Sequence, residues 1–218
     1  MLTKRILVRP QPTVFILSAH PRQNGRANSS ATSALRTYPT ARPRVAYRNK
    51  TFVSFASEDL HYYRLMCAWK ANERIDFDFL DAHDINTARD TSTPETIKRR
   101  LSERLANTKQ VVLLIGDVTR AKAARETSFL YHEVNTIQQL DIPVIFANLN
   151  RSRVADVARL PAKLVNRYTM SVAFGPKAIK FALDDFPETY RANLFAPVAS
   201  RKNNPHYYWD TVYTEQGL

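Results

Sequence analysis

The sequence predicts an α/β fold, built on an open, mostly parallel sheet of five strands with helices on both faces. Two observations carry this prediction. Strand-like and helix-like patterns alternate about five times between residues 50 and 185, which is typical of parallel strands joined by right-handed helical crossovers. The segment "QVVLLIGD" at 110–117 is apolar almost throughout, as expected of a strand that helices cover on both faces.

Two strands and one helix open this pattern. The segment "KTFVSFAS" at 50–57 is an apolar strand that ends in small polar residues. A helix is expected over 57–73, with Ser57 as its candidate N-cap. Its expected inner face consists of Tyr62, Leu65, Met66 and Trp69. The alternating segment "IDFDFLDA" at 75–82 predicts another strand, and the polar stretch 83–92 predicts a loop.

The middle of the chain continues the alternation. The segment "STPETIKRRLSERLANT" at 92–108 predicts a helix, because a Ser-Thr-Pro start precedes apolar residues four apart. The strand at 110–117 follows, and 119–127 is expected to be a loop. The segment "SFLYHEVNTIQQL" at 128–140 carries apolar residues at helical spacing. These residues are Leu130, Val134, Ile137 and Leu140. A strand over 142–150 comes next.

The C-terminal part is less regular. A weaker strand is expected over 168–174, and a helix from Pro176 to about Asp185. The aromatic stretch after it is expected to be an irregular extension. The predicted organisation is a tail over 1–46, one domain over 47–186 and the extension over 187–218.

The positive charge of the chain belongs to its N-terminal tail. The net charge is +12, yet residues 1–50 contain ten of the 32 Lys and Arg residues and none of the 20 acids. The rest of the chain is therefore nearly neutral. Composition and prolines predict that the tail is disordered. Three further interpretations stay open: sequence upstream of the natural start, a transit-like segment without an amphipathic helix, and a basic arm for anionic partners.

The sequence lacks the motifs that several kinds of binding and catalytic site require. The four glycines form neither GxxxxGK[ST] nor GxGxxG, so the sequence has no glycine-rich phosphate loop. No histidines have metal-ligand spacing, and Cys67 alone can form neither an internal disulfide nor a cysteine zinc cluster. Its apolar neighbours suggest a buried side chain. No apolar run has the length of a membrane span. We expect a cytoplasmic protein without metal or cofactor, whose chemistry depends on carboxylates and hydroxyls.

The strand order decides where a ligand would bind. With the order 2-1-3-4-5, the crevice lies beyond the carboxyl ends of the first and third strands. The segments "FASED" at 55–59 and "GDVTR" at 116–120 would form its walls. Glu133, on the helix that follows the third strand, is then placed beside the crevice.

Three segments carry a resemblance to a known family. They are "KTFVSFASEDLHYYRLMCAWKAN", "STPETIKRRLSERLANTKQVVLLIGD" and "TSFLYHEVNTIQQLDIPVIFANLN". Together they resemble the TIR-like proteins of bacteria (the DUF1863 group), which include the TIR component of the Thoeris anti-phage system. The resemblance runs from about Ala46 to Asp185. It implies a flavodoxin-like TIR fold and, in many members, hydrolysis or cyclisation of NAD+. In catalytic TIR domains the essential glutamate lies on the helix after the third strand, as Glu133 does here.

A single glutamate suffices for this reaction. Breaking the nicotinamide–ribose bond builds positive charge on the ribose, and an ionised carboxylate stabilises that charge without a metal. Nicotinamide leaves as a neutral group, so no general acid is required. Capture of the ribose by water gives ADP-ribose, and capture by a hydroxyl of the same molecule gives a cyclic isomer.

The other candidate contacts each have a structural alternative. Phe129 is by default a core aromatic, at a position where many active TIR domains have tryptophan. Ser54 and Ser57 are by default a strand hydroxyl and a helix cap. Asp59 is by default a first-turn acid favoured by the helix dipole. Asp84 and Arg89 in the second loop are by default solvated, and their functional alternative is closure over the adenine or contact between stacked subunits. Asp117 by default caps the turn after the third strand, although it faces the crevice.

The leading hypothesis is therefore an NAD+-processing enzyme of antiviral defence. It would self-associate on activation and act on a separate effector through a nucleotide messenger. Three alternatives remain: a TIR-like adaptor without turnover, a nucleoside deoxyribosyltransferase-like enzyme, and nucleic-acid binding through the basic tail. The nearly neutral charge of the predicted domain argues against the last of these.

Overall fold

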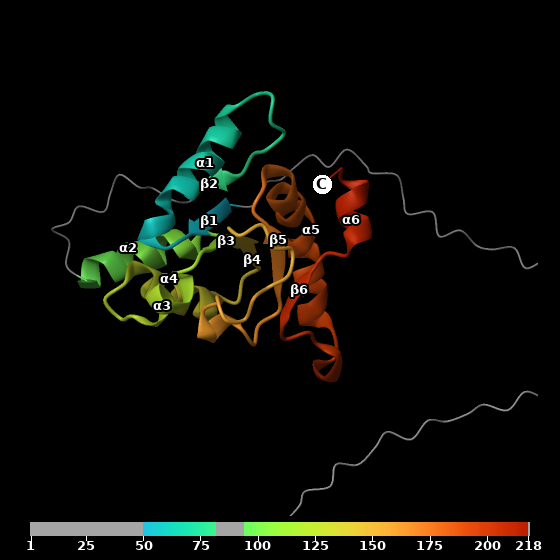
Figure 1. Cartoon of the computed structure of the whole chain (residues 1–218). Helices are drawn as coiled ribbons and strands as arrows, with labels where there is room; N and C mark the ends of the chain where they lie inside the picture. Colours follow the sequence, from blue (N-terminus) through green and yellow to red (C-terminus); the bar gives the residue numbers. More distant parts are fainter. Residues whose placement is uncertain (1–49, 82–93, 218) are drawn as a thin grey trace, which may run out of the picture. The chain divides into compact units, whose positions relative to one another are not determined.

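All strands of the sheet run parallel, in the order β2-β1-β3-β4-β5-β6. The structure is a computed structural model and describes residues 50–81 and 94–217 (Figure 1). The strands are β1 (Lys50–Ser54), β2 (Leu80–Asp81), β3 (Gln110–Ile115), β4 (Val144–Asn148), β5 (Thr169–Ala173) and β6 (Pro205–Tyr207). The parallel α/β architecture and the 2-1-3-4-5 order are confirmed. The predicted tail over 1–46 and loop over 83–92 lie outside the described residues.

Helices cover both faces of the sheet. They are α1 (Leu60–Ala71), α2 (Pro94–Ala106), α3 (Thr119–Ala124), α4 (Phe129–Leu140), α5 (Pro176–Phe195) and α6 (Asp210–Glu215). One core cluster joins α1 and α5 to one face, and the other joins α2, α3 and α4 to the opposite face (Figure 1). Successive residues of β3 alternate between the two clusters, which explains why this strand is apolar throughout.

Two helix predictions need correction. The inner face of α1 contains Tyr63 and Met66, whereas Leu65 is 41% exposed. Tyr63 is favoured inside because it stacks on Phe55 and its hydroxyl donates a 2.5 Å hydrogen bond to Asp81 beside it in β2. The predicted loop over 119–127 contains helix α3, whose Ala123 packs into the core.

The C-terminal stretch is a regular part of the fold and not an irregular extension. Helix α5 continues through Pro187, and β6 then adds a sixth strand beside β5, where five were predicted. Alternation in the sequence missed this strand because it has only three residues, none of them fully buried. Among the described residues, no helix combines the length and apolar character needed to cross a membrane.

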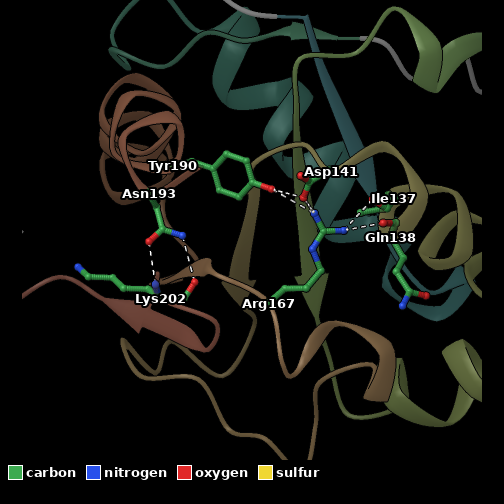
Figure 2. A network of polar contacts seen from close by, with 7 residues as sticks. All are labelled: Ile137, Gln138, Asp141, Arg167, Tyr190, Asn193 and Lys202. Atoms are coloured by element: carbon green, nitrogen blue, oxygen red, sulfur yellow. Dashed lines mark hydrogen bonds and ion pairs between the residues drawn. The ribbon is translucent and has the colours of Figure 1, made fainter. Parts of the chain in front are cut away.

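One polar network fixes the C-terminal end of α4 (Figure 2). The Arg167 guanidinium donates hydrogen bonds of 3.0 Å to the carbonyl oxygens of Ile137 and Gln138, and one of 2.8 Å to Asp141. Asp141 ends the helix in the left-handed region, with φ of 47°. The hydroxyl of Tyr190 on α5 donates a 2.7 Å hydrogen bond to the same carboxylate. Burial, followed by this hydrogen bond, raises the pKa of Tyr190 to about 12, so its hydroxyl stays a donor.

A second contact in the same region fixes the end of α5 (Figure 2). The side-chain amide of Asn193 donates a 3.0 Å hydrogen bond to the carbonyl of Lys202 and accepts a 2.8 Å hydrogen bond from its backbone N–H. This amide pair turns the chain back along the sheet toward β6.

We expect Arg167→Ala to lower the free energy of unfolding by about 2–3 kcal/mol, since helix carbonyls and a carboxylate lose their donor together. Arg191→Ala removes an exposed arginine of α5 as a matched control and is expected to change stability by less than about 0.5 kcal/mol. Chemical denaturation of both variants measures the difference. Equal values for the two would contradict the role given to Arg167.

Candidate functional site

Glu133 lies on the inner side of α4 and not on a solvated surface. Helix α4 begins at the N-cap Ser128, whose hydroxyl accepts a 3.2 Å hydrogen bond from the N–H of Leu130. Leu130, Val134 and Ile137 are buried as predicted, and Leu140 is half-buried. Glu133 is only 9% exposed. The carboxylate is therefore carried into the interior by the same stripe that packs the helix on the sheet.

Ser54, the last residue of β1, is the hydrogen-bond partner of this acid. Its hydroxyl donates a 2.6 Å hydrogen bond to Oε2 of Glu133. The bond joins the carboxyl end of a central strand to α4, the second helix between β3 and β4, as the topology of a parallel sheet favours. Two of the sequence candidates are thus in direct contact.

Burial controls the ionisation of Glu133. It raises the pKa of the carboxyl group to about 7, while the Ser54 hydrogen bond and the Arg104 guanidinium partly oppose this rise. Near neutral pH the group therefore exchanges readily between its neutral and ionised forms. Such a perturbed acid beside a cavity is typical of functional sites.

A cavity of about 200 Å³ lies at the first turn of α4. Its lining residues come from the segment after β1, from the end of α3 and from the start of α4: Phe55, Ser57, Lys122, Arg125, Thr127, Ser128, Phe129 and Leu130. Glu133 follows one turn after Phe129 and is not itself among these residues. The cavity offers aromatic surface, hydroxyls and two cationic side chains.

Phe129 lies at the surface of α4 and not in the core. It is 55% exposed and lines the cavity, so the expectation of a core aromatic is wrong. The reason is helical geometry: Phe129 is the first helical residue, one position outside the stripe that begins with Leu130.

The expected N-cap role of Ser57 is not observed. The segment Ser57–Asp59 forms a short 3-10 turn, η1, in which no side chain caps the helix. The Ser57 hydroxyl instead donates a 2.9 Å hydrogen bond to Glu58, at the edge of the cavity.

The acidic candidates lie away from the cavity or outside the described residues. Asp59 is buried, and its Oδ2 has no hydrogen-bond partner in the structure. Burial raises the pKa of this carboxyl group. It packs so closely on Gly116 that a Cβ there would lie 2.4 Å from the carboxylate. Asp117 is exposed and pairs with Arg159. Neither acid lines the cavity, and Asp84 and Arg89 fall in the segment that is not described.

Sequence reasoning missed the cationic side of the site. Lys122 forms a 2.5 Å ion pair with Glu58. The hydrogen bond from Lys122 lowers the pKa of Glu58 to about 2, with smaller contributions from its own backbone and from Ser57. The sequence pattern predicts a loop at both Lys122 and Arg125. The alanines and long basic side chains of "TRAKAAR" at 119–125 were the available signal, because these are strong helix formers.

The residue types restrict the chemistry that this site can perform. Among residues 50–81 and 94–217, no group of three His, Cys, Asp or Glu side chains is placed to hold a metal ion. Cys67 is half-buried rather than fully buried, and desolvation raises the pKa of its thiol. The arrangement instead suits a carboxylate that stabilises positive charge on a ligand, with aromatic and cationic contacts beside it.

Residues 52–153 match the family model described as Thoeris protein ThsB, TIR-like domain. The match extends from β1 past the end of β4, and so includes Ser54, Glu133 and every residue that lines the cavity. A comparison with curated proteins gave no match.

The raised pKa of Glu133 predicts a pH-dependent cost to stability. Its pKa rises from 4.5 to about 7 on folding. Below pH 4.5 the carboxyl group is protonated in both the folded and the unfolded chain, and the folded chain keeps its full stability. As pH rises through 7, ionisation favours the unfolded chain, and this stability is lost. Glu133→Gln cannot ionise. We expect this variant to resemble the native chain at pH 4.5 and to be more stable by about 3 kcal/mol at pH 8.

Denaturant unfolding of both proteins at the two pH values measures this effect. Glu188→Gln, which changes an exposed acid of α5, is the control and should show no such trend. A stability difference that stays constant with pH would contradict the raised pKa.

Proposed function

Because the chain carries a TIR-like domain of the Thoeris ThsB type, which supports a role in antiphage defence, we propose that it processes NAD+. The observation that carries the proposal is the buried Glu133–Ser54 pair beside an aromatic cavity. An ionisable carboxylate held in a desolvated place stabilises a developing cation more strongly than one in water.

In the proposed reaction, the bond between C1′ of the ribose and the nicotinamide nitrogen breaks. The electron pair stays with nicotinamide, which leaves as a neutral molecule, and the positive charge passes to the ribose. The ionised Glu133 stabilises this cation. Water then adds to C1′ and releases a proton, which yields ADP-ribose; a hydroxyl of the same molecule reacts in the same way to give a cyclic isomer.

Phe129 and Phe55 fit the flat nicotinamide ring. Both line the cavity, and aromatic faces attract a positively charged ring as well as covering its apolar surface. The proposed ligand contact of Ser54 is indirect, because its hydroxyl donates to Glu133 and so favours the ionised form of the acid. Ser57 stays a proposed direct contact, since it lines the cavity.

The position of Glu133 also bears on activation. The acid is buried and does not line the cavity in the isolated chain, so we expect slow turnover until self-association or another trigger shifts α4. A separate effector would then respond to the nucleotide product. The same observation favours the second candidate function, a TIR-like adaptor without turnover.

Glu133→Gln is expected to abolish NAD+ consumption while leaving the fold intact, because the amide is neutral at every pH. The assay is the release of nicotinamide at high protein concentration, and in extracts of phage-infected cells that express the chain. Glu188→Gln should remain as active as the native chain. Undiminished turnover by Glu133→Gln would contradict catalysis by this acid, whereas no turnover by any form would favour the adaptor.

Ser54→Ala is expected to shift the pH profile. The native kcat/KM should rise tenfold per pH unit below about 7 and level off above it, since the ionised acid is the active form. Loss of the hydrogen bond that favours this form should move the rise by about one unit to higher pH. Ser102→Ala, an exposed change on α2, is the control. A uniform loss of rate with an unmoved profile would indicate that Ser54 acts only on the fold.

A further inference from the structure

The cavity beside Glu133 has a cationic edge that cleavage of the glycosidic bond does not require. Lys122 lies in α3 and Arg125 directly follows this helix, three positions later. Both side chains line the cavity. The two positive charges therefore face one binding space.

The two cations differ in their present partners. Lys122 is paired with Glu58, whereas the guanidinium of Arg125 forms no ion pair or hydrogen bond with any residue that the structure describes. One acid thus faces two cations, and the edge of the cavity keeps a net positive charge. This arrangement attracts an anion with more than one negative charge.

We infer that Lys122 and Arg125 bind the pyrophosphate of a dinucleotide substrate, and that Glu58 competes with this group for Lys122. The inference rests on the proposed function and names the chemical feature by which the site selects its substrate. Arginine and lysine donate charge-assisted hydrogen bonds to phosphate oxygens, and arginine can do so with two parallel bonds.

The size of the cavity fits one end of a dinucleotide and not the whole molecule. Its volume of about 200 Å³ is below the range of about 300–1,000 Å³ that is typical of sites enclosing a whole drug-sized ligand. One end of a dinucleotide, the nicotinamide ring, would lie between the aromatic side chains. The pyrophosphate would then lie at the edge, where Arg125 is exposed.

Glu58 is well suited to exchange. It is exposed and accepts hydrogen bonds from Lys122 and Ser57, and an exposed ion pair is weak because water competes for both charges. A pyrophosphate brings more charge to the same lysine and also engages Arg125. Exchange of the Glu58 carboxylate for phosphate is therefore favourable.

The inference also separates two classes of substrate. A nucleoside without phosphate, as used in deoxyribosyl transfer, would leave Lys122 and Arg125 unused. Cations at this edge therefore favour a phosphate-bearing nucleotide over a free nucleoside.

The test measures binding and turnover independently. NAD+ binding is measured by calorimetry on the full chain with Glu133→Gln, which prevents consumption, and KM is measured with Glu133 present. Lys122→Ala and Arg125→Ala should each weaken NAD+ binding about tenfold, and Glu58→Gln should tighten it about threefold. Binding of nicotinamide riboside, which has no pyrophosphate, should change less than twofold in all three. Arg191→Ala, on the opposite face of the sheet, controls for net charge.

The outcomes distinguish this inference from the proposed function. Unchanged NAD+ binding in the lysine and arginine variants overturns the inference even if the chain is an active enzyme. Equal effects on NAD+ and nicotinamide riboside, weaker NAD+ binding after Glu58→Gln, or no NAD+ binding at all overturn it as well. If binding follows the expected pattern but no form consumes NAD+, the inference stands and the catalytic proposal fails.

Discussion

The hydrogen bond from Ser54 to Glu133 is the contact on which the candidate site depends. It joins the carboxyl end of β1 to helix α4 at a point where both partners are buried, so neither can exchange the other for water without cost. The sheet supplies the position of Ser54, and the apolar stripe of α4 supplies that of Glu133. The acid is thus held by the packing of the domain, while its ionisation is set by burial and by one hydroxyl.

The rest of the domain keeps α4 in place for this contact. At the N-terminal end, Ser128 caps the helix at the edge of the cavity. At the other end, Arg167 binds two of the last carbonyl oxygens and a carboxylate that Tyr190 also holds. The two donors at this second end, Arg167 just before β5 and Tyr190 on α5, lie outside the segment that matches the Thoeris family. The C-terminal part of the chain therefore supports a candidate site whose residues all precede it.

The sequence predicted the central sheet because long apolar strands and amphipathic helices depend mainly on local pattern. It predicted Glu133 as a candidate because parallel topology places the helix after the third strand beside the crevice. It missed β6, since two half-buried residues and one exposed residue leave no alternation to detect. It missed α3, since turn-like polarity concealed a basic helix. The Ser54–Glu133 contact and the Lys122–Glu58 pair join residues far apart in the chain. Such pairs are fixed by packing, which a single sequence does not reveal.

The electrostatics of the site link the proposed substrate to the state of the acid. In the free chain, burial keeps much of Glu133 neutral near pH 7, with Arg104 and Ser54 opposing this effect. A positively charged nicotinamide ring beside the acid would favour its ionised form, and the low local dielectric that disfavours the isolated charge would strengthen this attraction. The cations at the edge would draw the phosphates and so fix which end of the dinucleotide enters. A substrate with opposite charges at its two ends would then favour the ionised form of Glu133 as it binds, whereas a neutral nucleoside would not.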